Sequence, residues 1–125
     1  MDLGKKVKSE KIEKIINKNI LSEVWMLAAN SDISKGVENF YIDINNTFLT
    51  TVNTLDLLKN YLRKNTKIIF TSSSAVYGNV EKITSENDQK LMPISNYGSM
   101  KLASESFLSS FSHSKKLCTF IFRFP

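Results

Sequence analysis

The sequence predicts an α/β fold in which a parallel β-sheet is covered by helices. Helix-like and strand-like segments alternate along its 125 residues, which is the order that crossover connections between parallel strands require. The strand-like segments are also nearly continuous apolar runs, as is typical of strands buried on both faces. We see no internal repeat and no domain boundary, so we predict one domain.

The first half of the chain contains a predicted helix, a strand and a second helix. Ser9 is a suitable N-cap for the first helix, whose apolar stripe is Ile12, Ile15 and Ile16. The apolar run EVWMLAA, residues 23–29, has the length of a strand, and the following NSDISKG has the composition of a loop. From about residue 46 to 63, apolar residues recur every three or four positions, which predicts a helix.

The second half continues the alternation with a strand, a helix and a strand. KIIFTSS, residues 67–73, is rich in β-branched and aromatic residues. A long polar connection over residues 77–93 leads to a helix predicted from about residue 96 to 111. The apolar run LCTFIFRF, residues 117–124, is the third predicted strand. Its Cys118 is expected to be a small buried hydrophobe.

The composition excludes several classes of protein and site. With one cysteine and one histidine, His113, the chain offers neither an internal disulfide nor a ligand set for a metal, so we expect no metal site. No apolar run is long enough for a membrane span, and the N-terminal sequence is polar, so we expect a cytoplasmic protein without membrane contact. The net charge of +5 comes mostly from scattered lysines, and a site for a phosphate-bearing small molecule would fit it equally well. No alternation of arginine and aromatic residues marks a nucleic-acid surface, so we expect no nucleic acid.

Polar residues at the ends of the predicted strands form the candidate site. In parallel α/β sheets ligands bind at the carboxyl ends of the strands, which here correspond to the segments AANSD, TSSSAVYG and RFP. Tyr97 and Lys101 lie four residues apart and therefore on one helix face, where a lysine ammonium lowers the pKa of a phenol and makes it a proton acceptor. The alternatives are a surface pair without a role and serines that only cap backbone groups. A serine hydrolase is excluded, because there is no Gly-x-Ser-x-Gly motif.

Three motifs together resemble a known family. VWMLAANSDI, IIFTSSSAVYG and SNYGSMKLASE, in this order and at this spacing, resemble the extended short-chain dehydrogenase/reductases. The specific group is the NAD-dependent epimerase/dehydratase family, to which UDP-glucose 4-epimerase belongs. The resemblance covers residues 23–125. It implies that the chain is three strands and three helices of a larger Rossmann-type, doubly wound parallel sheet.

The resemblance also implies an activity and its residues. Tyr97 would be the general base or acid, Lys101 would lower its pKa and bind the nicotinamide ribose, and Ser73 would be the catalytic serine. The implied reaction is hydride transfer between a carbon of a nucleotide sugar and NAD, with NADP not excluded, and family members are often homodimers. The residues implied to contact the cofactor are Ala28, Ala29, Asn30, Ser72, Tyr97, Lys101, Phe124 and Pro125.

The sequence departs from the family pattern in ways that limit the expected activity. Its four glycines are too far apart for the Gly-rich turn that holds a pyrophosphate, and a substrate lobe is not expected within residues 1–125. We therefore expect the central to C-terminal part of an NAD(P)-binding domain, inactive alone, or alternatively a non-catalytic interaction protein with half the fold. Members that eliminate water carry acidic residues where this chain has Ser74 and Ala75, so an epimerase or reductase fits better than a dehydratase. Thr47 replaces an asparagine of many members.

Overall fold

The computed structural model describes residues 2–5, 10–17, 20–80, 85–88 and 90–125. Helices and strands alternate as predicted, with two short helical turns flanking α4 and β2. The elements are α1 (Glu10–Asn17), β1 (Glu23–Met26), α2 (Ile33–Glu38), α3 (Phe40–Asp43), a π-helical turn (Ile44–Leu49), α4 (Thr50–Leu58), β2 (Lys67–Ser73), a 3-10 turn (Ser74–Tyr77), α5 (Asn96–Lys115) and β3 (Cys118–Phe124).

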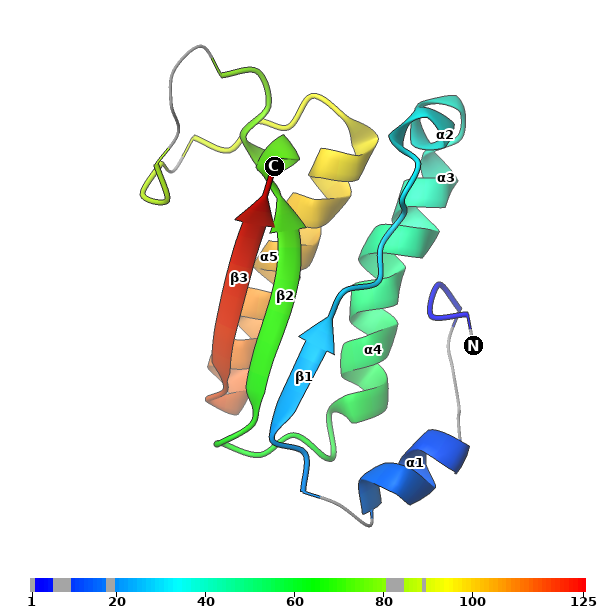
Figure 1. The fold of residues 1–125 in the computed structure, drawn as a ribbon, viewed down its shortest axis with the longest axis vertical. Coiled ribbons are helices and arrows are strands. Elements are labelled where there is room, and N and C mark those ends of the chain that lie inside the picture. The colour runs from blue at the N-terminus through cyan, green and yellow to red at the C-terminus, as the bar shows by residue number, and fades with distance from the viewer. Residues whose placement is uncertain (1, 6–9, 18–19, 81–84, 89) are drawn as a thin grey trace.

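The three strands form one parallel sheet in the order β1-β2-β3. Met26 pairs with Phe70 across β1 and β2, and Ser73 pairs with Phe124 across β2 and β3. All three carboxyl ends therefore lie at the same edge of the sheet, together with the beginning of α5 (Figure 1). The predicted α/β class with a parallel sheet is confirmed.

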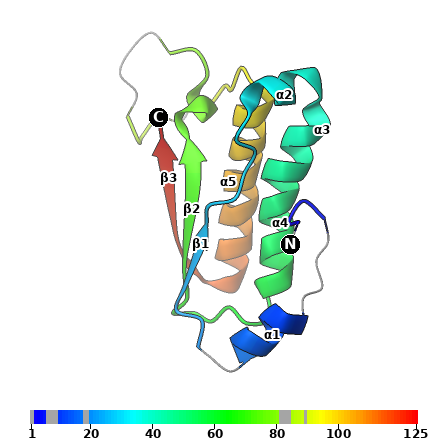
Figure 2. The same ribbon diagram turned by 45° about the vertical axis from the view of Figure 1, so that its right-hand side comes forward.

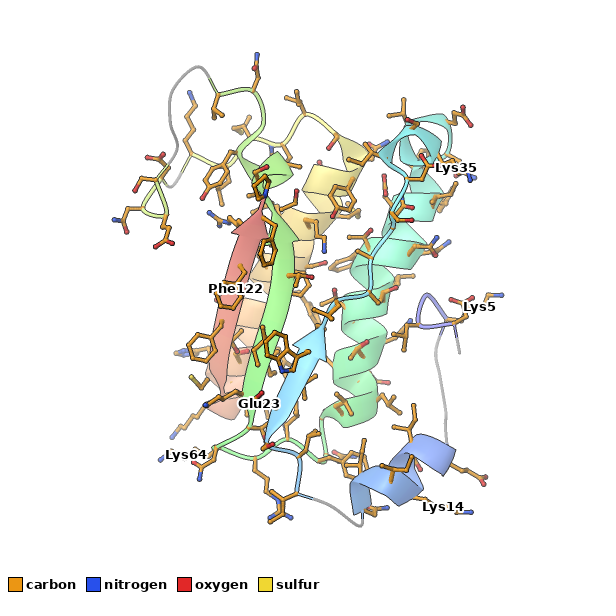
Figure 3. The ribbon with its side chains drawn as sticks, viewed as in Figure 1. Lys5, Lys14, Glu23, Lys35, Lys64 and Phe122 are labelled. Carbon is orange, nitrogen blue, oxygen red and sulfur yellow. The ribbon has the colours of Figure 1, made fainter. Side chains whose placement is uncertain are left out.

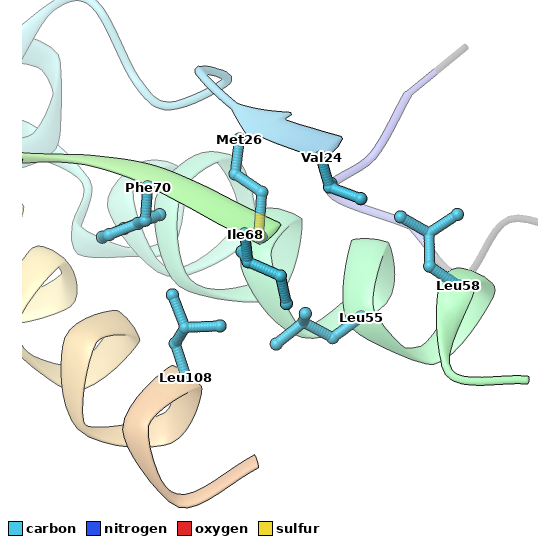
Figure 4. Close-up of a cluster of buried hydrophobic side chains, with 7 residues drawn as sticks. All are labelled: Val24, Met26, Leu55, Leu58, Ile68, Phe70 and Leu108. Carbon is cyan, nitrogen blue, oxygen red and sulfur yellow. The ribbon is translucent and has the colours of Figure 1, made fainter. Parts of the chain in front are cut away.

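One face of the sheet is covered by α4 and α5, which lie side by side (Figures 1 and 2). Side chains from these two helices meet alternate side chains of β1 and β2 in the core (Figure 4). The residues of this core are Val24, Met26, Leu55, Leu58, Ile68, Phe70 and Leu108. Burial of this layer positions α5, and hence its first turns, against the carboxyl end of β2.

The opposite face of the sheet is open, which corrects the expectation that both faces are buried. Every second side chain of β3 points to this face, and Trp25 of β1 is 62% exposed on it. Phe122 stands on the face turned away from α5 (Figure 3). Cys118 is exposed for the same reason, contrary to its predicted burial. Among the described residues no helix covers this face. The apolar sequence of β3 predicted burial on both faces, but one of its faces is exposed.

Helix boundaries differ from the prediction where short polar side chains cap additional turns. Asp32 accepts a hydrogen bond from the backbone N–H of Lys35 and begins α2 in a segment expected to be a loop. Asn39 likewise begins α3. The helical segment predicted over about residues 46–63 therefore starts earlier, at Phe40, and α4 ends earlier, at Leu58. Ser9, the predicted cap of the first helix, lies outside the described residues.

The connection between β2 and α5 begins with a glycine in an unusual conformation. Gly78 has φ +74°, and a Cβ at this position would lie 1.9 Å from the carbonyl oxygen of Met92. Glycine is required there both by the backbone conformation and by the close approach of the returning chain. Within the described residues, no helix combines the length and the apolar character that crossing a bilayer requires.

Candidate active site

The first helical turns of α5 pack directly on the turn that follows β2. Ser95 caps the helix by accepting a hydrogen bond from the backbone N–H of Gly98, at 3.0 Å. A Cβ on Gly98 would lie 2.6 Å from the carbonyl oxygen of Ala75, so only glycine permits this approach. The two segments that carry Tyr97 and Ser73 are thereby brought to the same edge of the sheet.

Lys101 is buried between α5 and β2, with 2% of its surface exposed. Its Nζ donates a hydrogen bond to the carbonyl oxygen of Thr71 at 2.7 Å and lies 5.7 Å from the centroid of the Tyr97 ring. Burial lowers the pKa of Lys101 to about 8, and the negative charge of Glu105 partly opposes this shift. Lys101 is therefore still mostly protonated at neutral pH, because its pKa lies only slightly above that pH.

Tyr97 is partly buried, and its pKa is raised above the ordinary value of 10.0. The larger cause is burial of the phenol, and the second is the negative charge of Asp43. This corrects the expectation of a lowered phenol pKa beside Lys101: burial and Asp43 raise it in this structure. Tyr97 is therefore a neutral phenol at neutral pH, the form that donates a proton.

Ser73 ends β2 in an extended conformation and caps the 3-10 turn that follows. Its hydroxyl oxygen accepts a hydrogen bond from the backbone N–H of Ala75 at 3.2 Å. Because that bond uses the oxygen as an acceptor, the hydroxyl proton is available to a ligand at the edge of the sheet. This orientation suits the role predicted for Ser73.

The predicted cofactor residues lie along the same edge, but their side chains differ in availability. Ala28 is exposed, whereas Ala29 and Asn30 are partly buried in the segment after β1. The side-chain amide of Asn30 is engaged by Asp32 and Asp43, and its backbone N–H by Thr47. Phe124 and Pro125 are exposed at the end of β3.

The side chain of Ser72, another predicted cofactor residue, points toward α5. It is buried, and its hydroxyl donates a hydrogen bond to Glu105 Oε1 on α5. Thr47, the replacement for an asparagine, is also buried, and its Oγ1 accepts the backbone N–H of Asn30. The hydroxyl of Ser72 is therefore engaged by α5 in this structure.

Three charged residues near the site were not found by sequence reasoning. Asp43 is fully buried, accepts a hydrogen bond from Asn30 at 2.7 Å, and its Oδ2 has no hydrogen-bond partner among the described residues. Glu105 and Arg123 form an ion pair at 2.7 Å. A signal for this pair existed, since Arg123 is a charge inside an apolar strand and needs a partner when buried. In the described part of the chain no group of potential metal ligands is present.

The comparisons with known proteins agree with this geometry. The family model described as GDP-mannose 4,6 dehydratase matches residues 4–124. The chain belongs to this family. The resemblance to the NAD-dependent epimerase/dehydratase family, and with it the partial Rossmann-type fold, is thereby confirmed.

Relatives of this epimerase/dehydratase chain are much longer than it is. A bifunctional UDP-glucose 4-epimerase and UDP-xylose 4-epimerase of Pisum sativum is 31% identical over 80% of the chain, which spans 28% of that protein. A putative UDP-arabinose 4-epimerase of Arabidopsis thaliana is 30% identical over 90% of the chain, which spans 26% of it. The crystal structure of the Thermus thermophilus UDP-glucose 4-epimerase in complex with NAD is 28% identical, covers 98% of the chain with a TM-score of 0.81, and is itself 39% covered.

Proposed function

We propose that this chain is the proton-transfer part of an NAD-dependent nucleotide-sugar epimerase, or of a related dehydrogenase/reductase. The observation that carries the proposal is Lys101, which is buried, held by the carbonyl of Thr71 and placed beside the Tyr97 ring at the carboxyl edge of a parallel sheet. The UDP-sugar 4-epimerases among its relatives support the substrate class.

The residues of the chain fit the nicotinamide end of the cofactor and lack the usual means of holding its pyrophosphate. Small residues at 28–29 leave space at the sheet edge, and Lys101 with Tyr97 would hold the nicotinamide ribose. The four glycines at 4, 36, 78 and 98 do not form a phosphate-binding turn. When bound, NAD supplies the hydride acceptor. We therefore propose that residues 1–125 are the central to C-terminal part of the cofactor domain and are inactive alone.

In the proposed mechanism the chain's own residues move one proton. Ser73 donates a hydrogen bond to the reacting sugar oxygen and orients it. Tyr97 exchanges the proton with that oxygen, and Lys101 stabilises the phenolate while the proton is away. Ser74 and Ala75 follow Ser73 and provide no acid for eliminating water, which supports an epimerase or reductase despite the dehydratase description of the family.

A chimera tests the roles of these residues. Residues 23–124 would replace the matching segment of the Thermus thermophilus UDP-glucose 4-epimerase, and conversion of UDP-glucose to its C4 epimer would be measured. We expect Tyr97→Phe in the chimera to lower kcat about 10²- to 10⁴-fold while NAD still binds. Tyr41→Phe, at an exposed tyrosine, is the matched control. An undiminished rate in Tyr97→Phe would remove Tyr97 from the mechanism, and NAD-dependent turnover by the 125-residue chain alone would contradict its inactivity.

A second candidate function, a non-catalytic interaction module, is favoured by the open face of the sheet. Trp25, Phe120, Phe122 and Phe124 expose large apolar surfaces there. A chimera that binds NAD and is folded but has no activity would favour this candidate. For the enzyme we also propose a cytoplasmic homodimer.

A further inference from the structure

Glu105 is the centre of a buried hydrogen-bond network that joins three elements of the fold. Its side chain is 7% exposed and lies on α5, one turn after Lys101. Oε1 accepts hydrogen bonds from the Ser72 hydroxyl and from Arg123 Nε, and Oε2 accepts from Arg123 Nη2 at 2.7 Å. The two bonds from Arg123 form a bidentate pair, the geometry in which guanidinium–carboxylate bonds are strongest.

The network fixes the backbone immediately before Ser73. Lys101 binds the carbonyl of Thr71, and Glu105 binds the hydroxyl of the next residue, Ser72. Two successive turns of α5 therefore hold two successive residues of β2. Arg123 also lies in register opposite Ser72 on β3, so the same carboxylate joins both strands at this level of the sheet.

The network also fixes the turn immediately after Ser73. Arg123 Nη1 donates a hydrogen bond to the Tyr77 hydroxyl at 2.9 Å, and the guanidinium lies 4.9 Å from the centroid of the Tyr77 ring. Tyr77 is the last residue of the 3-10 turn and is buried. Ser73 is thus held between two points, both of which depend on Glu105.

We propose that Glu105 is a positioning residue of the proton-transfer site, which holds Ser73 against α5 through Ser72, Arg123 and Tyr77. The inference rests on the proposed function only in taking Ser73, Tyr97 and Lys101 as the reacting group. The network engages the hydroxyl of Ser72, whereas the hydroxyl of Ser73 lies outside it and accepts only the backbone N–H of Ala75.

Glu105 acts on the site through its charge as well as through its hydrogen bonds. Around Lys101 the ionisable groups are Glu105 and Tyr97 on the same helix, Asp43 of α3 beyond Tyr97, and Arg123 of β3 bound to Glu105. Glu105 is the negative charge that raises the pKa of Lys101 against the effect of burial. Its hydrogen bonds raise the pKa of Arg123 further above the already high value of a free guanidinium, so this partner of Glu105 is always charged.

The test uses NMR of the 125-residue chain and needs no turnover. In Glu105→Gln we expect the pKa of Lys101, followed through its ε-carbon, to fall below about 8. We also expect hydrogen exchange of the protected amides at 72–77 to accelerate at least about tenfold, whereas the amides of Ile68 and Ile69 change little. Glu38→Gln, at an exposed carboxylate on α2, is the control and should change neither quantity.

The outcomes separate positioning from general stabilisation. Uniform acceleration across β2 with an unchanged Lys101 pKa would overturn the proposal, and so would no change in either quantity. If Glu105→Gln does not fold, Ser72→Ala decides, since it removes one hydrogen bond and keeps the charge. Ser72→Ala should accelerate hydrogen exchange of the amides at 72–77 and leave the pKa of Lys101 unchanged. Hydrogen exchange as slow as in the unaltered chain would refute the proposal that the Glu105 network holds Ser73. Failure here leaves the Tyr97→Phe test of the proposed function unaffected.

Discussion

Replacing Lys101 by methionine should remove a specific pH dependence from the stability of the fold. The folded chain releases the Lys101 proton near pH 8, whereas the unfolded chain holds it to about pH 10.5. Between these values the unfolded state binds more protons, so the free energy of unfolding rises with pH. Burial of the charged amine destabilises the folded state at neutral pH, and this is what lowers the pKa of Lys101. The destabilisation decreases as the amine becomes neutral at higher pH.

The magnitude follows from the size of the shift. Each pKa unit corresponds to about 1.4 kcal/mol, and the part of the shift that lies between pH 7 and pH 10 contributes about 2.5 kcal/mol as an upper value. Tyr97 acts in the opposite direction above about pH 10, because its raised pKa means that the unfolded state ionises first. Comparison of Lys101→Met with the unaltered chain cancels that contribution.

Urea unfolding followed by far-ultraviolet circular dichroism, at pH 7 and at pH 10, measures this difference. We expect the unaltered chain to gain about 2 kcal/mol more than Lys101→Met over that interval. Lys64→Met, at an exposed lysine between α4 and β2, should retain the full dependence. Equal slopes for the unaltered chain and Lys101→Met would show that Lys101 is not desolvated, and the description of the site would then be wrong.

Three further substitutions test the packing of the fold. Gly98→Ala should lower the free energy of unfolding by about 1–3 kcal/mol, because the new Cβ meets a backbone carbonyl that cannot move aside. This loss is expected despite a gain in helix propensity of about 1 kcal/mol. Urea titration measures it, and equal or higher stability would contradict the close approach. Leu108→Ala, at a fully buried core position, should cost about 2–5 kcal/mol in the same assay, and a cost below about 1 kcal/mol would contradict its burial. Phe122→Lys, on the open face, should raise the protein concentration at which light scattering detects self-association, with little change in stability, and unchanged association would show that this face does not drive it.

The alternating elements and the parallel sheet were predictable because they depend on patterns within single segments. KIIFTSS was predicted with the bounds that β2 has, and the three motifs carried the family. The boundaries of α2 and α3 were not predicted, since each depends on one capping side chain, Asp32 or Asn39, in a segment of loop-like composition. Capping is a local signal that the apolar periodicity does not contain.

The electrostatics of the site and the open face were less predictable, because both depend on residues far apart in the sequence. The spacing of Tyr97 and Lys101 predicts their proximity, but not that burial and Asp43 together raise the phenol pKa. The buried Glu105 likewise became meaningful only when β3 brought Arg123 beside Ser72. An apolar strand sequence also does not show whether a second layer is present, which is why the exposure of Cys118 and Phe122 was missed.

The close approaches at Gly78 and Gly98 have a consequence for how this chain can change over evolution or by design. Gly78 meets the carbonyl of Met92, and Gly98 meets that of Ala75, so the two ends of the intervening segment are held together independently of its length. Doubling the length of a flexible loop costs only about 0.6 kcal/mol of closure entropy. Insertions between residues 79 and 91 should therefore leave Ser73 and Tyr97 in place. We expect that segments that bind other ligands could be inserted there without changing the relative positions of Ser73 and Tyr97.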